Sequence, residues 1–134
     1  MSERHDMTGK RVLVTGANDG IGRATAAELA RSGAEVLLHG RNPAKVDEAT
    51  ATIRAETGAA VHGLVADFAR LAEVRRLADE VSERFGRLDV LVNNAGLIRD
   101  RLVLDEDGIE EVFQVNHLAP FLLTIALLPA LRAA

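Results

Sequence analysis

A glycine-rich turn near the N-terminus places the strongest constraint on how this chain can fold. Arg11–Thr15 is a compact run of β-branched and apolar residues, and the segment after Gly22 is rich in alanine and leucine. Between these two segments the chain has glycines at Gly16 and Gly20. This arrangement predicts a buried strand, a tight turn, and a helix that packs closely on the strand.

The same turn is suited to bind a phosphate group. Gly16 permits the turn, Gly20 lets the backbone approach a pyrophosphate, and Gly22 lets the helix lie close to the strand. The start of the helix then offers unpaired N–H groups and the positive end of the helix dipole. Glycines at this spacing also occur as simple turn residues, but their position between a strand and a helix favours binding. We therefore predict a dinucleotide site, with Asn18 and Ile21 of the turn among its contacts.

Apolar runs alternate with helix-like segments along the rest of the chain. Further strands are expected at Glu35–His39, Ala60–Ala66 and Leu88–Asn93, and further helices at Pro43–Thr57, Arg70–Phe85 and Gly108–Ala133. Asn42 is expected to cap the helix from Pro43, and Gly58 to end it. Buried strands separated by crossover helices are typical of a parallel sheet that is covered on both faces. The sequence thus predicts one α/β domain with a doubly wound parallel sheet, the Rossmann fold.

The composition is that of an ordinary soluble domain. Of the 134 residues, 48% are hydrophobic and 27% are charged, and the net charge of −4 argues against a nucleic-acid partner. The chain has no cysteine, which excludes disulfides and thiolate metal sites within it and fits a cytoplasmic location. Its four histidines show no ligand spacing, so we predict no metal site.

Two segments bear on targeting and membranes. Residues 1–9 are polar, contain no apolar signal segment, and are expected to be flexible. The most apolar stretch, Leu118–Leu131, is shorter than a membrane span and contains Pro120 and Pro129. A buried helix explains this stretch better, so we predict no membrane partner.

Three motifs together resemble the short-chain dehydrogenase/reductase family. Thr15-Gly-x-x-x-Gly-Ile-Gly22 is similar to the family's cofactor signature, and Asn93-Asn94-Ala95-Gly96 to its second motif. The third is Val115-Asn116-His117-Leu118 followed by Phe121–Thr124, which resembles the family's fifth helix. The amino-acid sequence around these motifs is most similar to that of the retinol-dehydrogenase-like reductases. The resemblance runs from Lys10 to the end and covers about the first half of a family member.

The resemblance implies an NAD(P)-binding half-domain over residues 1–134, with strand order 3-2-1-4, that ends with the fifth helix. It also implies an oxidoreductase that moves hydride between a carbonyl and an alcohol. By this resemblance Asp67 contacts the adenine ring, whereas Asn93, Ala95 and Gly96 steady the fourth strand and contact the ribose. Asp67 could also cap the helix that begins near Arg70, and the two roles can coexist. The side chain of Asn93 could instead bridge adjacent strands.

The end of the second strand bears on which nicotinamide cofactor is preferred. NAD-preferring relatives place an acid there for the ribose 2′-hydroxyl, but this chain has Gly40 at that position. The next residue, Arg41, can offer a guanidinium fork to a 2′-phosphate. A solvent-facing arginine is the alternative interpretation. The missing acid favours NADP(H) over NAD(H).

Of the family's catalytic Asn, Ser, Tyr and Lys, only the asparagine has a match, Asn116. Position 120 is proline, which has no N–H, so the carbonyl of Asn116 loses its helical donor and is free to take a water. By resemblance, such a water belongs to the family's proton relay. A simple helix kink at Pro120 explains the sequence equally well.

The other three catalytic residues have no counterpart. The chain contains no tyrosine, no serine after Ser82 and no lysine after Lys45. We therefore expect a truncated or fragmentary oxidoreductase that is inactive alone and takes a small carbonyl or alcohol only if the missing half is supplied. The alternatives are a non-catalytic dinucleotide-binding module, as a sensor or part of a split assembly, and the remnant of a truncated gene. The fourth strand would be an unpaired apolar edge, so self-association is expected.

Overall fold

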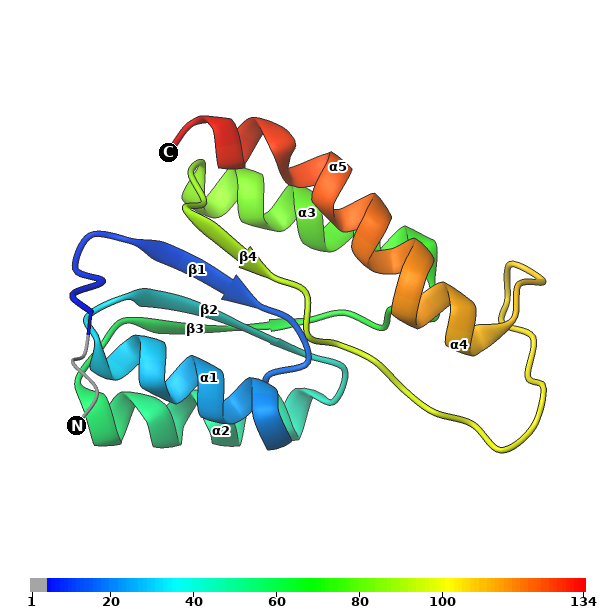
Figure 1. Cartoon of the computed structure of the whole chain (residues 1–134), viewed down its shortest axis with the longest axis horizontal. Coiled ribbons are helices and arrows are strands. Elements are labelled where there is room, and N and C mark those ends of the chain that lie inside the picture. Colours follow the sequence, from blue (N-terminus) through cyan, green and yellow to red (C-terminus); the bar gives the residue numbers. More distant parts are fainter. Residues whose placement is uncertain (1–4) are drawn as a thin grey trace.

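The computed structural model describes residues 5–134 and contains one four-stranded sheet (Figure 1). The strands are β1 (Arg11–Val14), β2 (Glu35–Gly40), β3 (Val61–Val65) and β4 (Val90–Val92). All of the neighbouring strands are parallel, and their order is β3-β2-β1-β4. The predicted sheet and its strand order are therefore confirmed.

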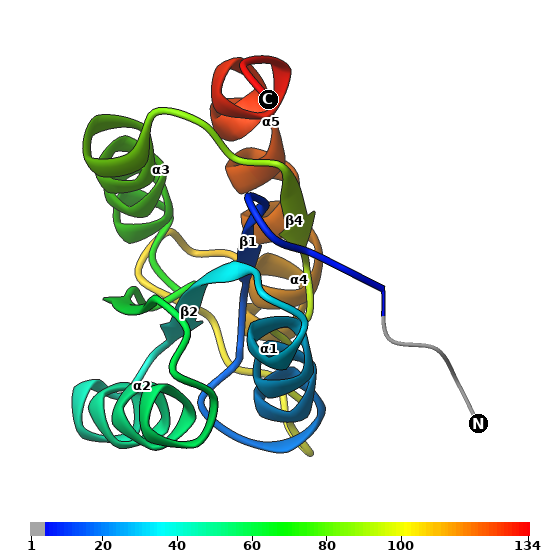
Figure 2. The same cartoon turned by 90° about the vertical axis from the view of Figure 1, so that its left-hand side faces the viewer.

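Helices cover both faces of the sheet (Figure 2). The longer ones are α1 (Gly20–Arg31), α2 (Pro43–Thr57), α3 (Leu71–Phe85) and α5 (Ala119–Arg132). Val12 and Val14 of β1 pack with α1 and α2, whereas Leu13 packs with α3 and α5. Because successive side chains of a strand point to opposite faces, one short apolar run builds two cores. This arrangement confirms the doubly wound fold.

Two of the predicted helix ends have the expected geometry. The side chain of Asn42 accepts a hydrogen bond from the N–H of Lys45 at 3.2 Å, which caps α2 ahead of Pro43. Gly58 then ends α2 with a φ of 70°, a left-handed conformation that glycine adopts without steric cost. These local signals place both ends of α2 correctly.

β4 is shorter than the six residues expected from the sequence. The N–H of Leu88 is taken by the carbonyl of Ala130 in α5, and the N–H of Asp89 by that of Arg11. At the other end, Asn93 turns toward α5. The Asp89 bond still joins β4 to β1, but Leu88 and Asn93 bond to α5, so the strand is limited to Val90–Val92.

The last helical stretch begins later than predicted, at Glu111 rather than Gly108. Glu110 is extended, and its carboxylate accepts hydrogen bonds from the N–H groups of Val112 and Phe113 at 2.6 and 3.0 Å. The cap is therefore Glu110, whose side chain lies beyond the acidic run of residues 105–107. Asp105 instead closes the preceding loop by accepting from the N–H of Ile109.

This stretch consists of α4 (Glu111–Phe113), a π-helical segment (Gln114–Leu118) and α5. Together they form 22 residues, Glu111–Arg132, that are long and apolar enough to cross a membrane. Leu123 and Leu127 are buried against α3, whereas Phe121 and Ile125 are 63% and 50% exposed. Only one side of the helix is therefore a core surface.

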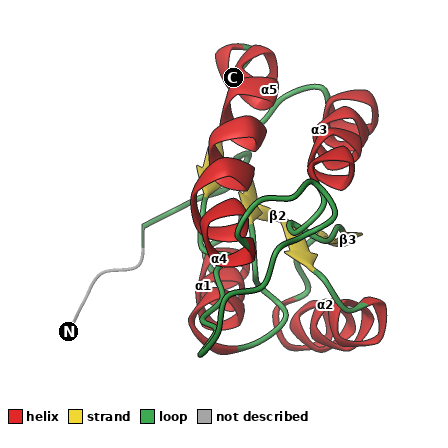
Figure 3. Cartoon of the chain, turned by 90° about the vertical axis from the view of Figure 1, so that its right-hand side faces the viewer, coloured by secondary structure: helices red, strands yellow, loops and turns green. Residues whose placement is uncertain are grey.

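The connection from β4 to α4 projects beyond the carboxyl ends of the strands (Figures 1 and 3). Ion pairs fasten it at two points, Arg70 with Glu106 and Arg99 with Glu111. At the opposite end of the chain, the predicted flexible segment 1–9 lies partly outside the described residues. Within the described part, the N–H of Met7 donates to the carbonyl of Ser32.

Candidate functional site

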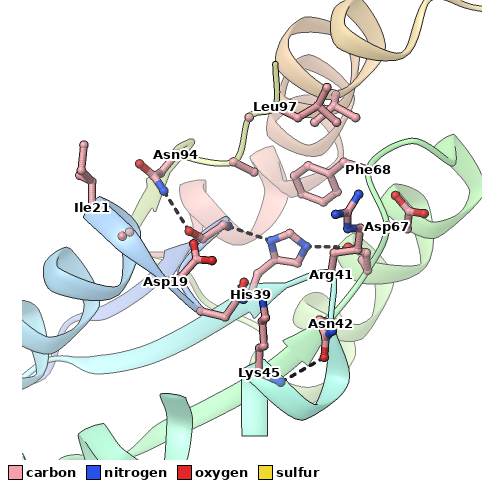
Figure 4. Close-up of a pocket in the computed structure, with 18 residues that line it drawn as sticks. Asp19, Ile21, His39, Arg41, Asn42, Lys45, Asp67, Phe68, Asn94 and Leu97 are labelled. Atoms are coloured by element: carbon pink, nitrogen blue, oxygen red, sulfur yellow. Dashed lines mark hydrogen bonds between the residues drawn. The ribbon is translucent and has the colours of Figure 1, made fainter. Parts of the chain in front are cut away.

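A pocket of about 610 Å³ opens at the carboxyl ends of the strands, where α/β sheets usually bind ligands (Figure 4). The β1–α1 turn, the end of β2, the end of β3 and the loop after β4 form its walls. All of the cofactor contacts predicted from the sequence line it except Asn93: Gly16, Asn18, Gly20, Ile21, Gly22, Arg41, Asp67, Ala95 and Gly96. The fold thus gathers residues from four separate segments around one cavity.

The pocket also contains side chains that the sequence did not single out. They are Asp19, His39, Asn42, Lys45, Phe68, Asn94, Leu97 and Val115. Asn94 belongs to a recognised motif, in which the sequence does not tell which asparagine faces the pocket. Lys45 lies one helical turn after Arg41, a spacing that could have identified it. For His39 and Phe68 the sequence gives no signal, because both belong to otherwise apolar segments.

Two glycines of the turn allow a very close approach between segments. A Cβ on Gly22 would lie 2.3 Å from the carbonyl oxygen of Gly16 and 2.4 Å from Nδ2 of Asn94. Gly16 itself has a φ of 61°, and a Cβ there would lie 2.7 Å from Cα of Ala95. No side chain fits at either position. The roles predicted for these glycines, a tight turn and close packing of the helix, are both confirmed.

Gly20 differs from the other two glycines because it faces open space. Its φ is 58°, but a Cβ built there would meet no atom within 4 Å. Asp19, the N-cap of α1, makes no side-chain hydrogen bond to the first helical turn. Since the first N–H groups of a helix have no partner within it, those of α1 remain available to a ligand.

Thr15 and Asn94 hold the turn against the loop after β4. Oγ1 of Thr15 accepts hydrogen bonds from the N–H groups of Asn94 and Ala95, both at 3.0 Å. Nδ2 of Asn94 donates to the carbonyls of Thr15 and Gly16, at 3.2 and 3.1 Å. The two segments lie almost 80 residues apart in sequence, and these four bonds fix one side of the pocket.

His39 forms the floor between the turn and β3. Its Nδ1 accepts from the N–H of Gly16 at 3.1 Å, and its Nε2 donates to the carbonyl of Ala66 at 2.9 Å. The ring stacks on Phe68 with centroids 4.3 Å apart. Burial lowers the pKa of His39 to about 4, although the bond to Ala66 partly opposes this shift. The ring is therefore neutral near pH 7, and its two bonds select one tautomer.

Two cations of the β2–α2 segment, Arg41 and Lys45, face the pocket beside Asn42 (Figure 4). Within residues 5–134, neither cation forms an ion pair with a carboxylate, unlike Arg23, which pairs with Glu48. Both lie at the N-terminal end of α2, where the helix dipole adds positive potential. This side of the pocket is suited to an anion.

Asp67 lies in the pocket beyond the end of β3, but it does not cap α3. The helix begins at Leu71, and its N-cap is Arg70. The carboxylate of Asp67 accepts from the N–H of Ala69 at 2.9 Å, which forms a local turn. Helix capping, the alternative to cofactor contact, is therefore wrong for this residue.

Asn93 is directed away from the pocket. Its Nδ2 donates to Oγ1 of Thr124 at 3.1 Å, and that hydroxyl donates to the carbonyl of Pro120 at 2.7 Å. The side chain thus connects β4 with α5, rather than bridging adjacent strands. The pocket-facing member of the pair is Asn94.

Asn116 lies behind the pocket wall rather than in it. Its Oδ1 accepts from the N–H of Leu97 at 2.8 Å, and its Nδ2 donates to the carbonyl of Leu97 at 2.9 Å. This pair of bonds holds the loop that follows Gly96, which does line the pocket. The side chain therefore positions the loop.

The helix around Asn116 is wider than an α-helix. The N–H of Ala119 donates to the carbonyl of Gln114, five residues back, as in a π-helix. The next residue, Pro120, has no N–H and can serve neither Val115 nor Asn116. As predicted, Pro120 cannot supply the usual fourth-residue donor to the Asn116 carbonyl, and the structure has a π-helical segment at this point.

The structure gives less support for a metal site than for an anion site. Among residues 5–134, no group of three or more His, Cys, Asp or Glu side chains is arranged to hold a metal ion.

Comparison with known proteins yields consistent matches. The family described as short chain dehydrogenase matches residues 10–134. The mouse protein "Retinol dehydrogenase 14" is 46% identical over 96% of this chain and 42% of its own length. Among solved structures, the RhlG/NADP active-site complex of Pseudomonas aeruginosa is 32% identical with a TM-score of 0.85, over 99% of this chain and 52% of its own. L-sorbose reductase from Gluconobacter frateurii, in complex with NADPH and L-sorbose, is 28% identical with a TM-score of 0.86, covering 98% and 51%. The chain thus spans about two-fifths to one-half of the proteins it matches.

The close approach at Gly22 gives a first prediction. Gly22→Ala should lower the free energy of unfolding by about 1–3 kcal/mol, because a backbone carbonyl cannot move away from the added methyl group cheaply. Thr25→Ala on the same helix is the control and should change it by less than about 0.5 kcal/mol. Urea unfolding measures both. Equal effects of the two changes would contradict the packing described for Gly22.

The buried neutral His39 gives a second prediction, on pH. Its folded pKa of about 4 lies below the ordinary value of 6.5, so its contribution to stability is complete above pH 6.5. As the pH falls from 6.5 to 4, His39 becomes protonated in the unfolded chain but stays neutral in the folded chain. The free energy of unfolding should then fall by about 1.4 kcal/mol per pH unit from this residue.

Urea unfolding at pH 7, 6 and 5 tests this dependence. His39→Asn removes the titrating ring, so its stability should depend less on pH than that of the unchanged protein. His117→Asn, at an exposed position, is the matched control and should keep the original slope. A slope in His39→Asn as steep as in the unchanged protein would refute the assignment.

Proposed function

Since the chain belongs to the short-chain dehydrogenase family, we propose that it is the NADP(H)-binding part of an oxidoreductase. The reaction is hydride transfer between a carbonyl and an alcohol. The observation that carries this proposal is one pocket that combines a glycine turn at a helix N-terminus with two unpaired cations, Arg41 and Lys45. Because the chain spans less than half of its curated relative, the activity of the whole protein is part of the proposal.

The residues of the pocket fit a dinucleotide with a 2′-phosphate. The open space at Gly20 and the free N–H groups of α1 suit the pyrophosphate. The side of the pocket at Asp67 and Phe68 suits the adenine ring, and Arg41 and Lys45 suit the 2′-phosphate. When bound, the nicotinamide supplies or accepts the hydride.

The residues of this chain would bind and orient the cofactor, but they would not carry out the whole reaction. Asn116 holds Leu97 through its side chain. Its backbone carbonyl, which cannot accept from Pro120, is the group that we propose binds a water of the proton relay. A carbonyl–alcohol reaction also needs a group that exchanges a proton with the substrate oxygen. The family's tyrosine has no counterpart in these 134 residues. We therefore propose that they bind the cofactor but do not turn over a substrate alone.

The proposal extends to the substrate and to the location of the protein. A small carbonyl or alcohol is the proposed substrate class, supplied with the remainder of the site by further protein. The alternatives, a non-catalytic module or a gene remnant, gain nothing from the matches, which carry the names of dehydrogenases and reductases. The absence of cysteine fits a cytoplasmic location. Burial of one side of α5 favours a role in the domain over a membrane span.

NADPH binding and Arg41 provide the main test. NADPH should raise the melting temperature of the chain, since a ligand that binds only the folded state stabilises it. Arg41→Ala should weaken NADPH binding by about 10- to 100-fold, because it removes a charge-assisted bond to the phosphate, and should weaken NADH binding far less. Fluorescence titration of the reduced cofactors measures both affinities.

Arg75→Ala, an exposed arginine of α3 outside the pocket, is the matched control and should leave both affinities unchanged. Equal losses for NADPH and NADH in Arg41→Ala would refute the preference for NADP(H). A folded chain that binds neither cofactor would refute the proposed function as a whole.

We also propose self-association through β4 and α5. The outer edge of β4 has no strand beside it within the described residues, and Phe121 and Ile125 form an exposed apolar strip. Light scattering should therefore show dimers or larger species. Phe121→Glu together with Ile125→Glu should shift them toward the monomer, whereas a monodisperse monomer at high concentration would contradict this proposal.

A further inference from the structure

Gly40 ends β2 in a closely packed space, where an added side chain would force its neighbours to move. A Cβ built on it would lie 2.4 Å from Oδ1 of Asn18 and 2.9 Å from its Cγ. The same Cβ would lie 2.7 Å from Cγ2 of Val46, a buried side chain of α2. The φ of Gly40 is not in the left-handed region, so backbone conformation does not require a glycine here. The requirement comes from the neighbouring side chains.

Asn18 reaches this space from a different segment, the β1–α1 turn. Its side chain is half-buried and lines the pocket, and within the described residues it makes no hydrogen bond. The N–H of the preceding residue, Ala17, donates to the carbonyl of His39 at 2.7 Å, which holds the turn against the end of β2. The position of Asn18 against Gly40 is thus set by backbone pairing between β2 and the turn.

We propose that Asn18 is a specificity-determining residue that selects the cofactor by steric exclusion. Its side chain fills the space in which an acid at position 40 would bind a ribose 2′-hydroxyl. This inference rests on the proposed function. The inference gives the preference for NADP(H) a second cause. The sequence lacks an acid at position 40, and packing against Asn18 also opposes one there.

The positive charges of Arg41 and Lys45 also contribute to the proposed selection of NADP(H) over NAD(H). Within residues 5–134, neither Arg41 nor Lys45 pairs with a carboxylate, and an acid at position 40, next to Arg41 in the chain, would reduce the positive charge of this region. With Asn18 in place, the cations remain available to a phosphate, and the neutral amide next to them does not repel it. Excluding the acid and attracting the phosphate are therefore two effects of one arrangement.

Melting temperatures test the exclusion without any ligand. Gly40→Ala should lower the melting temperature by about 5 °C in the unchanged chain, because the added methyl group meets Asn18 and Val46. In an Asn18→Ala background the same change should cost less than half as much, since the contact with Val46 remains. Asp19→Ala is the matched control background, from the same turn, and should leave the cost of Gly40→Ala unchanged.

Cofactor titration then tests the selection. Gly40→Asp alone should weaken both NADH and NADPH, because the acid cannot enter the space. Adding Asn18→Ala should strengthen NADH binding by about tenfold over Gly40→Asp alone, while NADPH stays weak. Asn18→Ala alone should still prefer NADPH, because Gly40 and Arg41 are unchanged.

The outcomes separate this inference from the proposed function. An equal cost of Gly40→Ala in the unchanged and Asn18→Ala backgrounds would overturn the exclusion. Tighter NADH binding by Gly40→Asp alone would overturn it as well. If the unchanged chain binds neither cofactor, the proposed function fails, and the melting temperatures still decide whether Asn18 excludes a side chain at position 40.

Discussion

The contact between the β1–α1 turn and the loop after β4 is the constraint on which the pocket depends. At Gly16 and Gly22 the two segments approach so closely that a single Cβ would push them apart. Thr15 and Asn94 then join them through four hydrogen bonds. This contact directs the first turn of α1 toward the cavity. Without it, the helix N-terminus and the loop would not form one wall.

His39 extends this arrangement across the sheet. A histidine with so little contact with water is tolerated because both ring nitrogens have partners and the ring stacks on Phe68. It joins the glycine turn to the end of β3, where Ala66 precedes the pocket residue Asp67. The phosphate side and the adenine side of the proposed cofactor site therefore share one buried group.

The pocket and the groups needed for the proposed proton chemistry come from different parts of the protein. The cofactor pocket is formed almost completely by the segments from β1 to the loop after β4, so 134 residues suffice to build it. Asn116 lies behind that loop and acts on it through Leu97. The proton chemistry of the proposed reaction needs groups that these residues do not include. Under the proposed function, cofactor binding and catalysis would depend on different parts of the protein.

The sequence alone determined the element order, the parallel sheet, most of the residues singled out that line the pocket, and the cap at Asn42. These depend on periodicity, glycine conformation and capping within a few residues, which are local properties. Only the tertiary structure decided that Asn94 rather than Asn93 faces the pocket, that Glu110 begins the last helix, and that His39 forms the floor. Contacts between segments far apart in sequence set these features, as they set the packing of Asn18 against Gly40. No local pattern encodes which of two neighbouring side chains meets a distant strand.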